Sequence, residues 1–169
     1  MKKLGFLVLL ALLLTGCGAT ETFETVSDEY LLPAGSTLQE VSLVLPEETD
    51  VQVMKEQYGS LYLCQGYTLT VHTAEGGDLN RTLTAATGFS REELQLMESR
   101  QGEIKRYEAV WAAAGENEPQ VGRICILDDG SYHYVLTAMT DASVSAQMQE
   151  PLQEVFSSFQ LVEGTNTAP

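Results

Sequence analysis

The segment that decides the fold runs from residue 121 to residue 140 and reads VGRICILDDGSYHYVLTAMT. Its two halves, 121–127 and 132–140, are rich in aliphatic, β-branched and aromatic residues, which is typical of strands. Asp129-Gly130 lies between them and favours a tight type I′ turn. The segment therefore predicts an antiparallel hairpin.

Further elements extend this hairpin on both sides. Residues 103–113 show a period of two, with one face formed by Tyr107, Ala109, Trp111 and Ala113. Residues 103–113, 121–127 and 132–140 are therefore expected to form an antiparallel meander. Pro151 fits the first turn of a final helix, whose apolar stripe is formed by Leu152, Val155, Phe156 and Phe159. That stripe predicts a helix packed on the sheet.

The N-terminal half predicts shorter strands, at 23–27, 38–45, 51–54, 61–65 and 67–73. The last of these alternates most clearly and places His72 with the polar residues, towards solvent. A helix follows, with Asp78 as its N-cap and Gly88 as its C-terminal stop. Ser90 and Glu93 fit a capping box, so a second short helix is expected up to residues 100–102.

This order of elements predicts an α+β fold, a mainly antiparallel sheet covered by helices. Residues Asp128–Thr137, followed after a helix-length gap by Val155–Phe159, resemble the C-terminal half of PsbP-like domains. Those domains are small α/β/α sandwiches found in extrinsic photosystem proteins and in many bacterial lipoproteins. The resemblance implies the same sandwich and a non-enzymatic, accessory or binding style of function. It names no ligand, and it does not extend to the photosynthetic role.

The N-terminus reads as an export signal. Two lysines precede an apolar run, Leu4–Leu14, that is too short to span about 30 Å of hydrocarbon. Its end, Leu14-Thr15-Gly16-Cys17, resembles the lipobox of bacterial lipoproteins. The resemblance implies that Cys17 becomes the mature N-terminus and carries a thioether-linked diacylglycerol with fatty acyl chains such as palmitate. We expect a signal peptide at 1–16, a tether at 17–22, one domain at 23–163 and a loose tail at 164–169.

The predicted location is the cell membrane, with the domain lipid-anchored and facing outside the cytoplasm. The chain has 24 acidic and nine basic residues and a net charge of −15. Nucleic acid and anionic headgroups are therefore not expected as partners, because like charges would meet. Apart from the membrane itself, reached through Cys17, the expected partner is an envelope protein or a small ligand.

Beyond Cys17, two cysteines remain, Cys64 and Cys125. In an oxidising compartment they fit either a disulfide or two buried thiols, and sequence does not decide between them. Together with His72 and His133 they would make a metal set only if all four converged, and no short metal-ligand spacing supports that. We expect neither a metal site nor another cofactor.

No nucleophile elbow, phosphate-binding glycine loop, His-Glu-x-x-His pair or EF-hand series is found in the sequence, and no catalytic residue is assigned. The remaining candidates are aromatic. If a ligand groove exists, it should involve Tyr107, Trp111, Tyr132 and Tyr134, although such residues more often form core and cross-strand pairs. The leading hypothesis is a non-catalytic binding or accessory lipoprotein. Two alternatives stay open: a metal-dependent factor or enzyme that uses His72 and His133, and a structural or assembly factor of the envelope.

Overall fold

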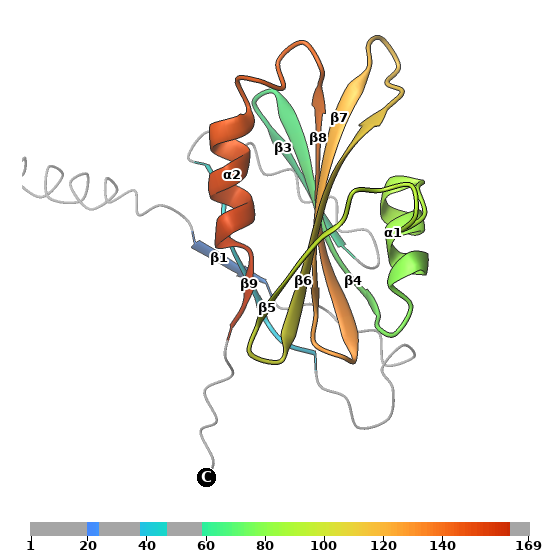
Figure 1. Cartoon of the computed structure of the whole chain (residues 1–169). Helices are drawn as coiled ribbons and strands as arrows, with labels where there is room; N and C mark the ends of the chain where they lie inside the picture. The colour runs from blue at the N-terminus through green and yellow to red at the C-terminus, as the bar shows by residue number, and fades with distance from the viewer. Residues whose placement is uncertain (1–19, 24–37, 47–58, 163–169) are drawn as a thin grey trace, which may run out of the picture.

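The computed structural model of the chain describes residues 20–23, 38–46 and 59–162, which form two antiparallel sheets and two helices (Figure 1). The predicted signal with Cys17, the strand predicted at 51–54, most of the strand predicted at 23–27, and the tail at 164–169 lie outside the described residues. Among the described helices, none is long and apolar enough to cross a membrane.

The larger sheet has six strands in the order β3-β4-β8-β7-β6-β5, and every neighbouring pair is antiparallel. The predicted meander is confirmed as β6-β7-β8. The strand bounds are β3 Gly59–Cys64, β4 Tyr67–Glu75, β5 Met97–Gln101, β6 Ile104–Ala113, β7 Gln120–Asp128 and β8 Tyr132–Asp141.

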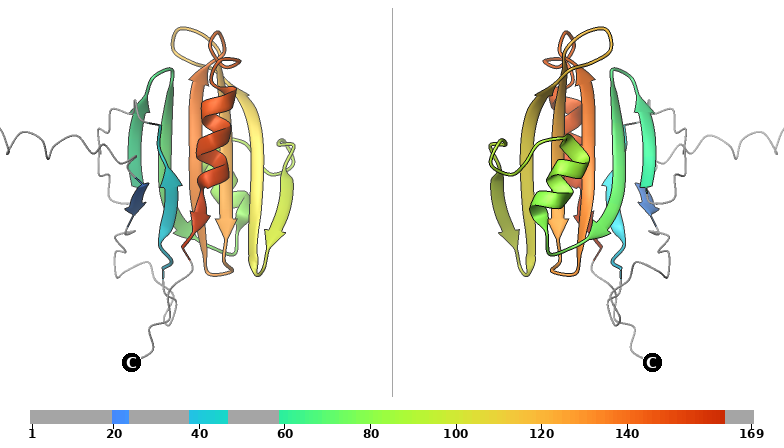
Figure 2. Two further views of the ribbon diagram at one scale, coloured as in Figure 1. Left: turned by 90° about the vertical axis from the view of Figure 1, so that its left-hand side faces the viewer. Right: turned by 90° about the vertical axis from the view of Figure 1, so that its right-hand side faces the viewer.

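Other elements cover both faces of this sheet (Figure 2). One face carries helix α2, Gln149–Ser158, and a small sheet of β1, Thr20–Phe23, β2, Val41–Val44, and β9, Gln160–Leu161. The other face carries helix α1, Leu79–Thr87. The fold is therefore α+β, an α/β/α sandwich as predicted. Because β1 begins at Thr20, regular structure starts inside the stretch expected to be a tether.

Alternation along the central strands produces two separate hydrophobic cores. The core under α2 contains Phe156, Phe159, Tyr134 and Leu136, all fully buried. The core under α1 contains Leu83, Trp111, Ile124 and Val135. Burial of each such side chain contributes about 1.5–3 kcal/mol of transfer free energy. The two clusters hold the helices on opposite faces.

The ends of α1 follow the sequence closely. The Asp78 carboxylate accepts a hydrogen bond from the backbone N–H of Arg81 at 2.9 Å, as an N-cap should. Gly88 takes the left-handed conformation, with φ of +81°, and its N–H bonds to the carbonyl of Thr84 at 2.9 Å. Both predictions are confirmed, as is the position of Pro151 in the first turn of α2.

The second helix predicted after Ser90 is wrong. The Ser90 backbone N–H does bond to the Glu93 carboxylate at 2.8 Å, but only a single turn forms around this pair. The chain then enters β5, which pairs with β6 through a two-residue turn that starts at Gly102, where φ is +63°. Pairing with β6 satisfies the backbone groups on one side of β5, so a tertiary contact overrides the local helix signal.

The turn between β7 and β8 also differs from the prediction. A type I′ turn needs positive φ at both central residues, but among the described residues only glycines have positive φ. Gly130, with φ of +91°, is instead the first central residue of the turn, and the Asp129 N–H bonds to the Tyr132 carbonyl at 3.2 Å. The turn is therefore centred one residue later than expected.

Candidate functional site

The four aromatic residues predicted to line a groove do not come together. Tyr107 and Trp111 belong to the core under α1, whereas Tyr132 and Tyr134 belong to the core under α2. All four are buried, with exposed fractions from 0% to 8%. The sheet separates the two pairs, so they cannot form one ligand groove, and their role is core packing. Tyr132 and Tyr134 contact each other edge to face, with 6.4 Å between ring centroids.

The two cysteines are not bridged and lie far apart in the sheet. Cys64 is on β3 and Cys125 is on β7, with β4 and β8 between them. Three strand spacings of about 4.8 Å exceed the Cα separation of about 7 Å that a disulfide tolerates. The alternative of a disulfide between Cys64 and Cys125 is therefore wrong for this fold. Burial raises the pKa of the Cys125 thiol to about 12, so this thiol stays protonated and unreactive at neutral pH.

A polar junction ties the β7–β8 turn to the chain before β2. One carboxylate oxygen of Asp129 accepts the backbone N–H groups of Ser131 at 2.8 Å and Tyr132 at 2.7 Å. The other accepts the Tyr134 hydroxyl and the Gln39 side-chain amide, each at 3.0 Å. Four donors of the protein thus bind this carboxylate, which indicates a structural role for Asp129.

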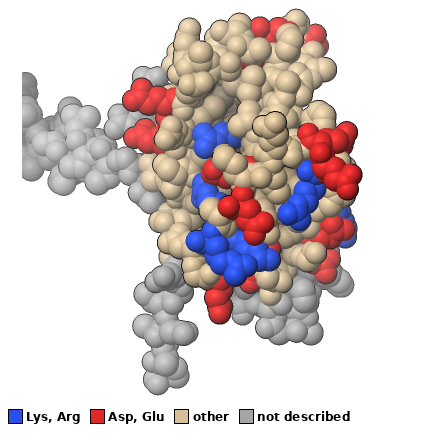
Figure 3. Space-filling model, in the orientation of Figure 1, with Lys and Arg blue, Asp and Glu red and all other residues tan. Residues whose placement is uncertain are grey.

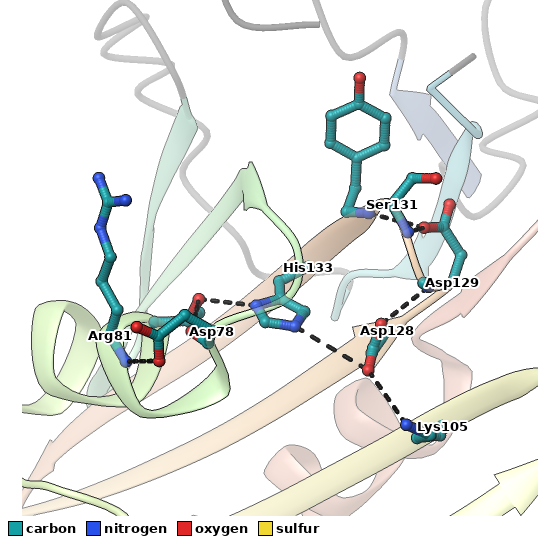
Figure 4. A network of polar contacts seen from close by, with 10 residues as sticks. Asp78, Arg81, Lys105, Asp128, Asp129, Ser131 and His133 are labelled. Carbon is teal, nitrogen blue, oxygen red and sulfur yellow. Dashed lines mark hydrogen bonds and ion pairs between the residues drawn. The ribbon is translucent and has the colours of Figure 1, made fainter. Parts of the chain in front are cut away.

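A second polar cluster surrounds His133 on the α1 side of the sheet (Figure 4). Its Nδ1 lies 2.7 Å from the Thr82 hydroxyl of α1, and its Nε2 lies 4.0 Å from the Asp128 carboxylate. The Lys105 ammonium lies 3.9 Å from the same carboxylate oxygen of Asp128. The cluster therefore links α1 to the adjacent ends of β8, β7 and β6.

The electrostatics of both histidines favour neutral imidazoles. Burial lowers the pKa of His133, and the carboxylates of Asp128, Asp129 and Asp78 only partly oppose that shift. Burial also lowers the pKa of His72. The prediction that His72 points to solvent is therefore only partly right, since it lies on the polar side of β4 but is half-buried.

His72 and His133 lie on one face of neighbouring strands. His72 pairs with Val135 and His133 with Ala74, so the two histidines are diagonal neighbours, about 7–8 Å apart. His133 is only 1% exposed and its Nδ1 is engaged by Thr82, an arrangement suited to holding α1 on the sheet. Within the described part of the chain, no group of three His, Cys, Asp or Glu could hold a metal ion.

The most exposed regular element is one that sequence reasoning missed. All five residues of β5 are exposed, and β5 forms one edge of the six-stranded sheet. Both faces of this strand meet solvent, so it lacks the alternation of apolar and polar residues that reveals a half-buried strand. Gly102 at the hairpin turn was the one available signal.

The described basic residues come from one part of the chain, which includes this edge. Every lysine and arginine among the described residues lies between Arg81 and Arg123, on α1, β5, β6, β7 or the loops that join them. In the view of Figure 3 basic side chains lie in several groups on the visible face, with acidic side chains between and around them. The same stretch also carries seven glutamates, so this part of the chain is close to neutral within a chain of net charge −15.

No protein-family model matches the chain, and no curated protein matches its sequence. Solved structures with the same fold do exist. The chain is similar to cyanobacterial PsbP (CyanoP) from Synechocystis, with a TM-score of 0.55, 12% identity, and coverage of 88% of this chain and 95% of that one. It is also similar to LpqN, involved in cell envelope biogenesis of Mycobacterium tuberculosis, with a TM-score of 0.52, 10% identity, and coverage of 73% and 83%.

A protein of Bacteroides thetaiotaomicron gives a TM-score of 0.52 and 11% identity over 76% of this chain. The chain spans about half the length of that protein, 47%. At these identities the likeness shows the fold alone, and that fold is PsbP-like.

Proposed function

We propose that this chain is an extracytoplasmic lipoprotein, anchored by lipid on Cys17, whose PsbP-like domain binds another envelope component without catalysing a reaction. The observation that carries the proposal is the sequence Leu14-Thr15-Gly16-Cys17 at the end of a short apolar run. The similarity to LpqN, a protein involved in cell envelope biogenesis, supports an envelope role for the same fold.

The start of the fold suits a short tether. β1 begins at Thr20, three residues after Cys17, so at most about 10 Å of chain separates the lipidated residue from regular structure. β1 belongs to the small sheet on the α2 side. An anchor at Cys17 would therefore hold the domain against the membrane from this layer. Two acyl chains bury enough methylene groups, at about 0.8 kcal/mol each, for stable attachment.

The described side chains that are most often catalytic have structural partners here, which favours binding over catalysis. His133 is 1% exposed, and the Asp129 carboxylate is fully hydrogen-bonded. A general acid or base must reach the substrate within hydrogen-bond distance. His133 cannot do so without opening the core, and Asp129 can do so only by giving up hydrogen bonds within the protein.

The test is intact mass spectrometry of the chain from native membranes, beside membrane fractionation of wild type and Cys17→Ser. The expected mass begins at Cys17 and includes a diacylglycerol, and the Cys17→Ser variant should leave the membrane fraction. An unlipidated, full-length species in the membrane fraction would overturn the anchor. Turnover of a substrate that is lost on replacement of His72 or His133, with the fold retained, would overturn the non-catalytic part.

A further inference from the structure

Strand β5 has an unpaired backbone edge whose outward groups can be assigned. Its hairpin with β6 closes at Gln101 and Ile104 around the two-residue turn Gly102-Glu103. Such a turn closes on a hydrogen-bonded pair, and hydrogen-bonded positions alternate along an antiparallel ladder. The backbone N–H and C=O groups of Glu98 and Arg100 therefore point away from β6, to the free edge of the sheet.

The side chains of β5 are complementary in charge to those of an antiparallel second copy of the same strand. The strand is Met97-Glu98-Ser99-Arg100-Gln101, so an antiparallel copy centred on Ser99 places Glu98 opposite Arg100 of the second copy, twice. Those are the residues whose backbone groups face outward, so each Glu98–Arg100 pair would exchange two backbone hydrogen bonds. Opposite charges at directly opposed positions stabilise a pair of strands. Charged edge strands usually discourage pairing. A strand with an acidic residue on one side of its centre and a basic residue on the other still accepts an antiparallel copy of itself, because each charge then lies opposite a charge of the other sign.

The charges on this edge are not satisfied within the described part of the chain. Its ion pairs involve neither Glu98 nor Arg100. Arg100 lies opposite Lys105 on β6, a like-charge pair that is locally unfavourable. A carboxylate from a second copy would offset that repulsion.

We infer that two copies of this chain pair edge to edge through β5, related by a two-fold axis at Ser99, and form one continuous antiparallel sheet. The axis is perpendicular to the sheet, so the α2 layers of both copies lie on the same side. Because β1 belongs to that layer, both Cys17 tethers would leave the dimer towards the same side. The geometry is thus compatible with two anchors in one membrane, and in this respect the inference rests on the proposed function.

Pairing of two five-residue strands buries less surface than a permanent dimer interface does. The expected association is therefore weak and reversible in solution. Attachment to a membrane confines the copies to a thin layer and raises their effective concentration. The dimer should accordingly form on membranes at protein levels that leave the free chain monomeric.

Charge reversal tests the pairing directly. Glu98→Arg alone and Arg100→Glu alone each place like charges opposite one another twice, so each variant should lose at least about tenfold in self-association. An equal mixture of the two variants restores both opposite-charge pairs and should dimerise like wild type. Arg91→Glu and Glu92→Arg, exposed and outside β5, are controls with the same changes in net charge. Sedimentation of the lipidated chain in nanodiscs and in concentrated detergent solution measures the dimer.

Cross-linking locates the axis. A non-hydrogen-bonded pair has its Cα atoms about 4.5 Å apart, which a disulfide accepts, so Ser99→Cys should give an oxidised dimer. Met97→Cys should not, because the two cysteines would be about 13 Å apart along the strands. The wild-type chain, which has Cys64 and Cys125 but no cysteine at position 99, shows whether those two cysteines form cross-links by themselves. Adding Glu98→Arg to Ser99→Cys should abolish the cross-link, and mixing that chain with Arg100→Glu/Ser99→Cys should restore it.

The outcomes separate the dimer from the anchor. A lipidated chain in the membrane fraction that stays monomeric, or whose two charge variants fail to rescue each other, would overturn the dimer alone. A chain that lacks lipid would overturn the anchor, and cross-linking of the concentrated chain would then decide the dimer. Binding of an unrelated envelope protein to β5 with no self-association would also overturn the inference.

Discussion

The hydroxyl of Tyr134 donates a hydrogen bond to the carboxylate of Asp129, with 3.0 Å between the two oxygens. The same hydroxyl accepts the backbone N–H of Gln39 at 2.9 Å, so one buried phenol joins the β7–β8 turn to the chain entering β2. Burial and the nearby Asp129 carboxylate raise the pKa of Tyr134. The phenol therefore stays protonated and remains a donor throughout the physiological range.

Replacing Tyr134 with Phe should destabilise the fold. The ring and its packing stay, but the backbone N–H of Gln39 and the carboxylate of Asp129 each lose a hydrogen-bond partner. A partly buried polar group left unpaired costs about 1–3 kcal/mol, so the free energy of unfolding should fall by that amount. Urea denaturation followed by circular dichroism measures the change.

Tyr132→Phe is the matched control. The Tyr132 hydroxyl is also buried, but it has no hydrogen-bond partner within the described residues. Removing it should leave the free energy of unfolding unchanged or slightly higher. Equal losses in the two variants would show that the Tyr134 contacts contribute nothing specific.

Arg106 should be a second determinant of stability, because its guanidinium closes the C-terminal end of α2. Nη1 donates to the Phe159 carbonyl at 2.9 Å, Nη2 to the Phe156 carbonyl at 2.6 Å, and Nε and Nη2 both to the Glu108 carboxylate. Arg106→Met keeps the aliphatic stem but removes all four bonds. Because these bonds are charge-assisted and partly buried, about 2 kcal/mol of unfolding free energy should be lost.

Arg106→Lys should recover less than half of that loss, because a lysine cannot reproduce the planar fork of donors. The neighbouring Lys105→Met is the control. Lys105 is more exposed and only 3.9 Å from Asp128, so its removal should change the free energy of unfolding by less than about 0.5 kcal/mol. Thermal unfolding of all three variants in one buffer ranks them, and a full recovery by lysine would contradict the fork argument.

The fold was predictable where local patterns and tertiary packing agree. The alternation around Trp111, the apolar run through Ile124 and the stripe ending at Phe159 each have a buried face, and each became the predicted element. β5 was not predictable in this way. Glu93 reaches back to the Ser90 N–H as expected, but the Ser90 hydroxyl donates to the Glu93 carboxylate instead of accepting from the Glu93 N–H. Pairing with β6 then determined the structure of the next residues, and a window of neighbouring residues holds no information about that contact.

The proposed aromatic groove failed for a related reason. A period of two shows that Tyr107 and Trp111 share one face and that Tyr132 and Tyr134 share one face. It does not show whether those are the same face, because that depends on the register between β6, β7 and β8. The register places the two pairs on opposite sides of the sheet. Hydrophobic pattern therefore identified the core residues but not their layer.

His133 and His72 should make stability depend on pH. Burial lowers the pKa of each in the folded state, so the unfolded chain binds protons more readily below its own histidine pKa of about 6.5. Above the unfolded-state pKa of about 6.5 the histidines are neutral in both the folded and the unfolded chain, so their protonation costs no stability. Stability is lost as the pH falls through about 6.5 towards the lower folded values. The free energy of unfolding should thus decline as the pH falls below about 6.5.

Single variants separate the contributions of the two histidines to this dependence of the unfolding free energy on pH. His133→Gln should remove its own share of the decline, and His72→Gln the other, while the double variant should be nearly flat over the same range. Urea titrations at three pH values give the slopes. Parallel curves for wild type and His133→Gln would mean that the pKa of His133 is the same in the folded and unfolded chain.

Gly122 and Trp111 should be strongly coupled. A Cβ atom placed on Gly122 would lie 2.2 Å from two atoms of the Trp111 indole ring, which is itself 8% exposed in the core under α1. A rigid, buried ring cannot move aside cheaply, so Gly122→Ala should lower the free energy of unfolding by about 1–3 kcal/mol. Trp111 is the single tryptophan of the chain, so its fluorescence reports both unfolding and any shift of the ring.

A double-mutant cycle tests this coupling. Trp111→Leu alone should destabilise the core by removing a large buried ring, but it also clears the space above Gly122. Adding Gly122→Ala to that variant should therefore lower the unfolding free energy by clearly less than it does in wild type. Chemical denaturation followed by circular dichroism covers the variants without tryptophan. An equal effect of Gly122→Ala in both backgrounds would place the requirement for glycine in the backbone of β7 rather than in the indole ring.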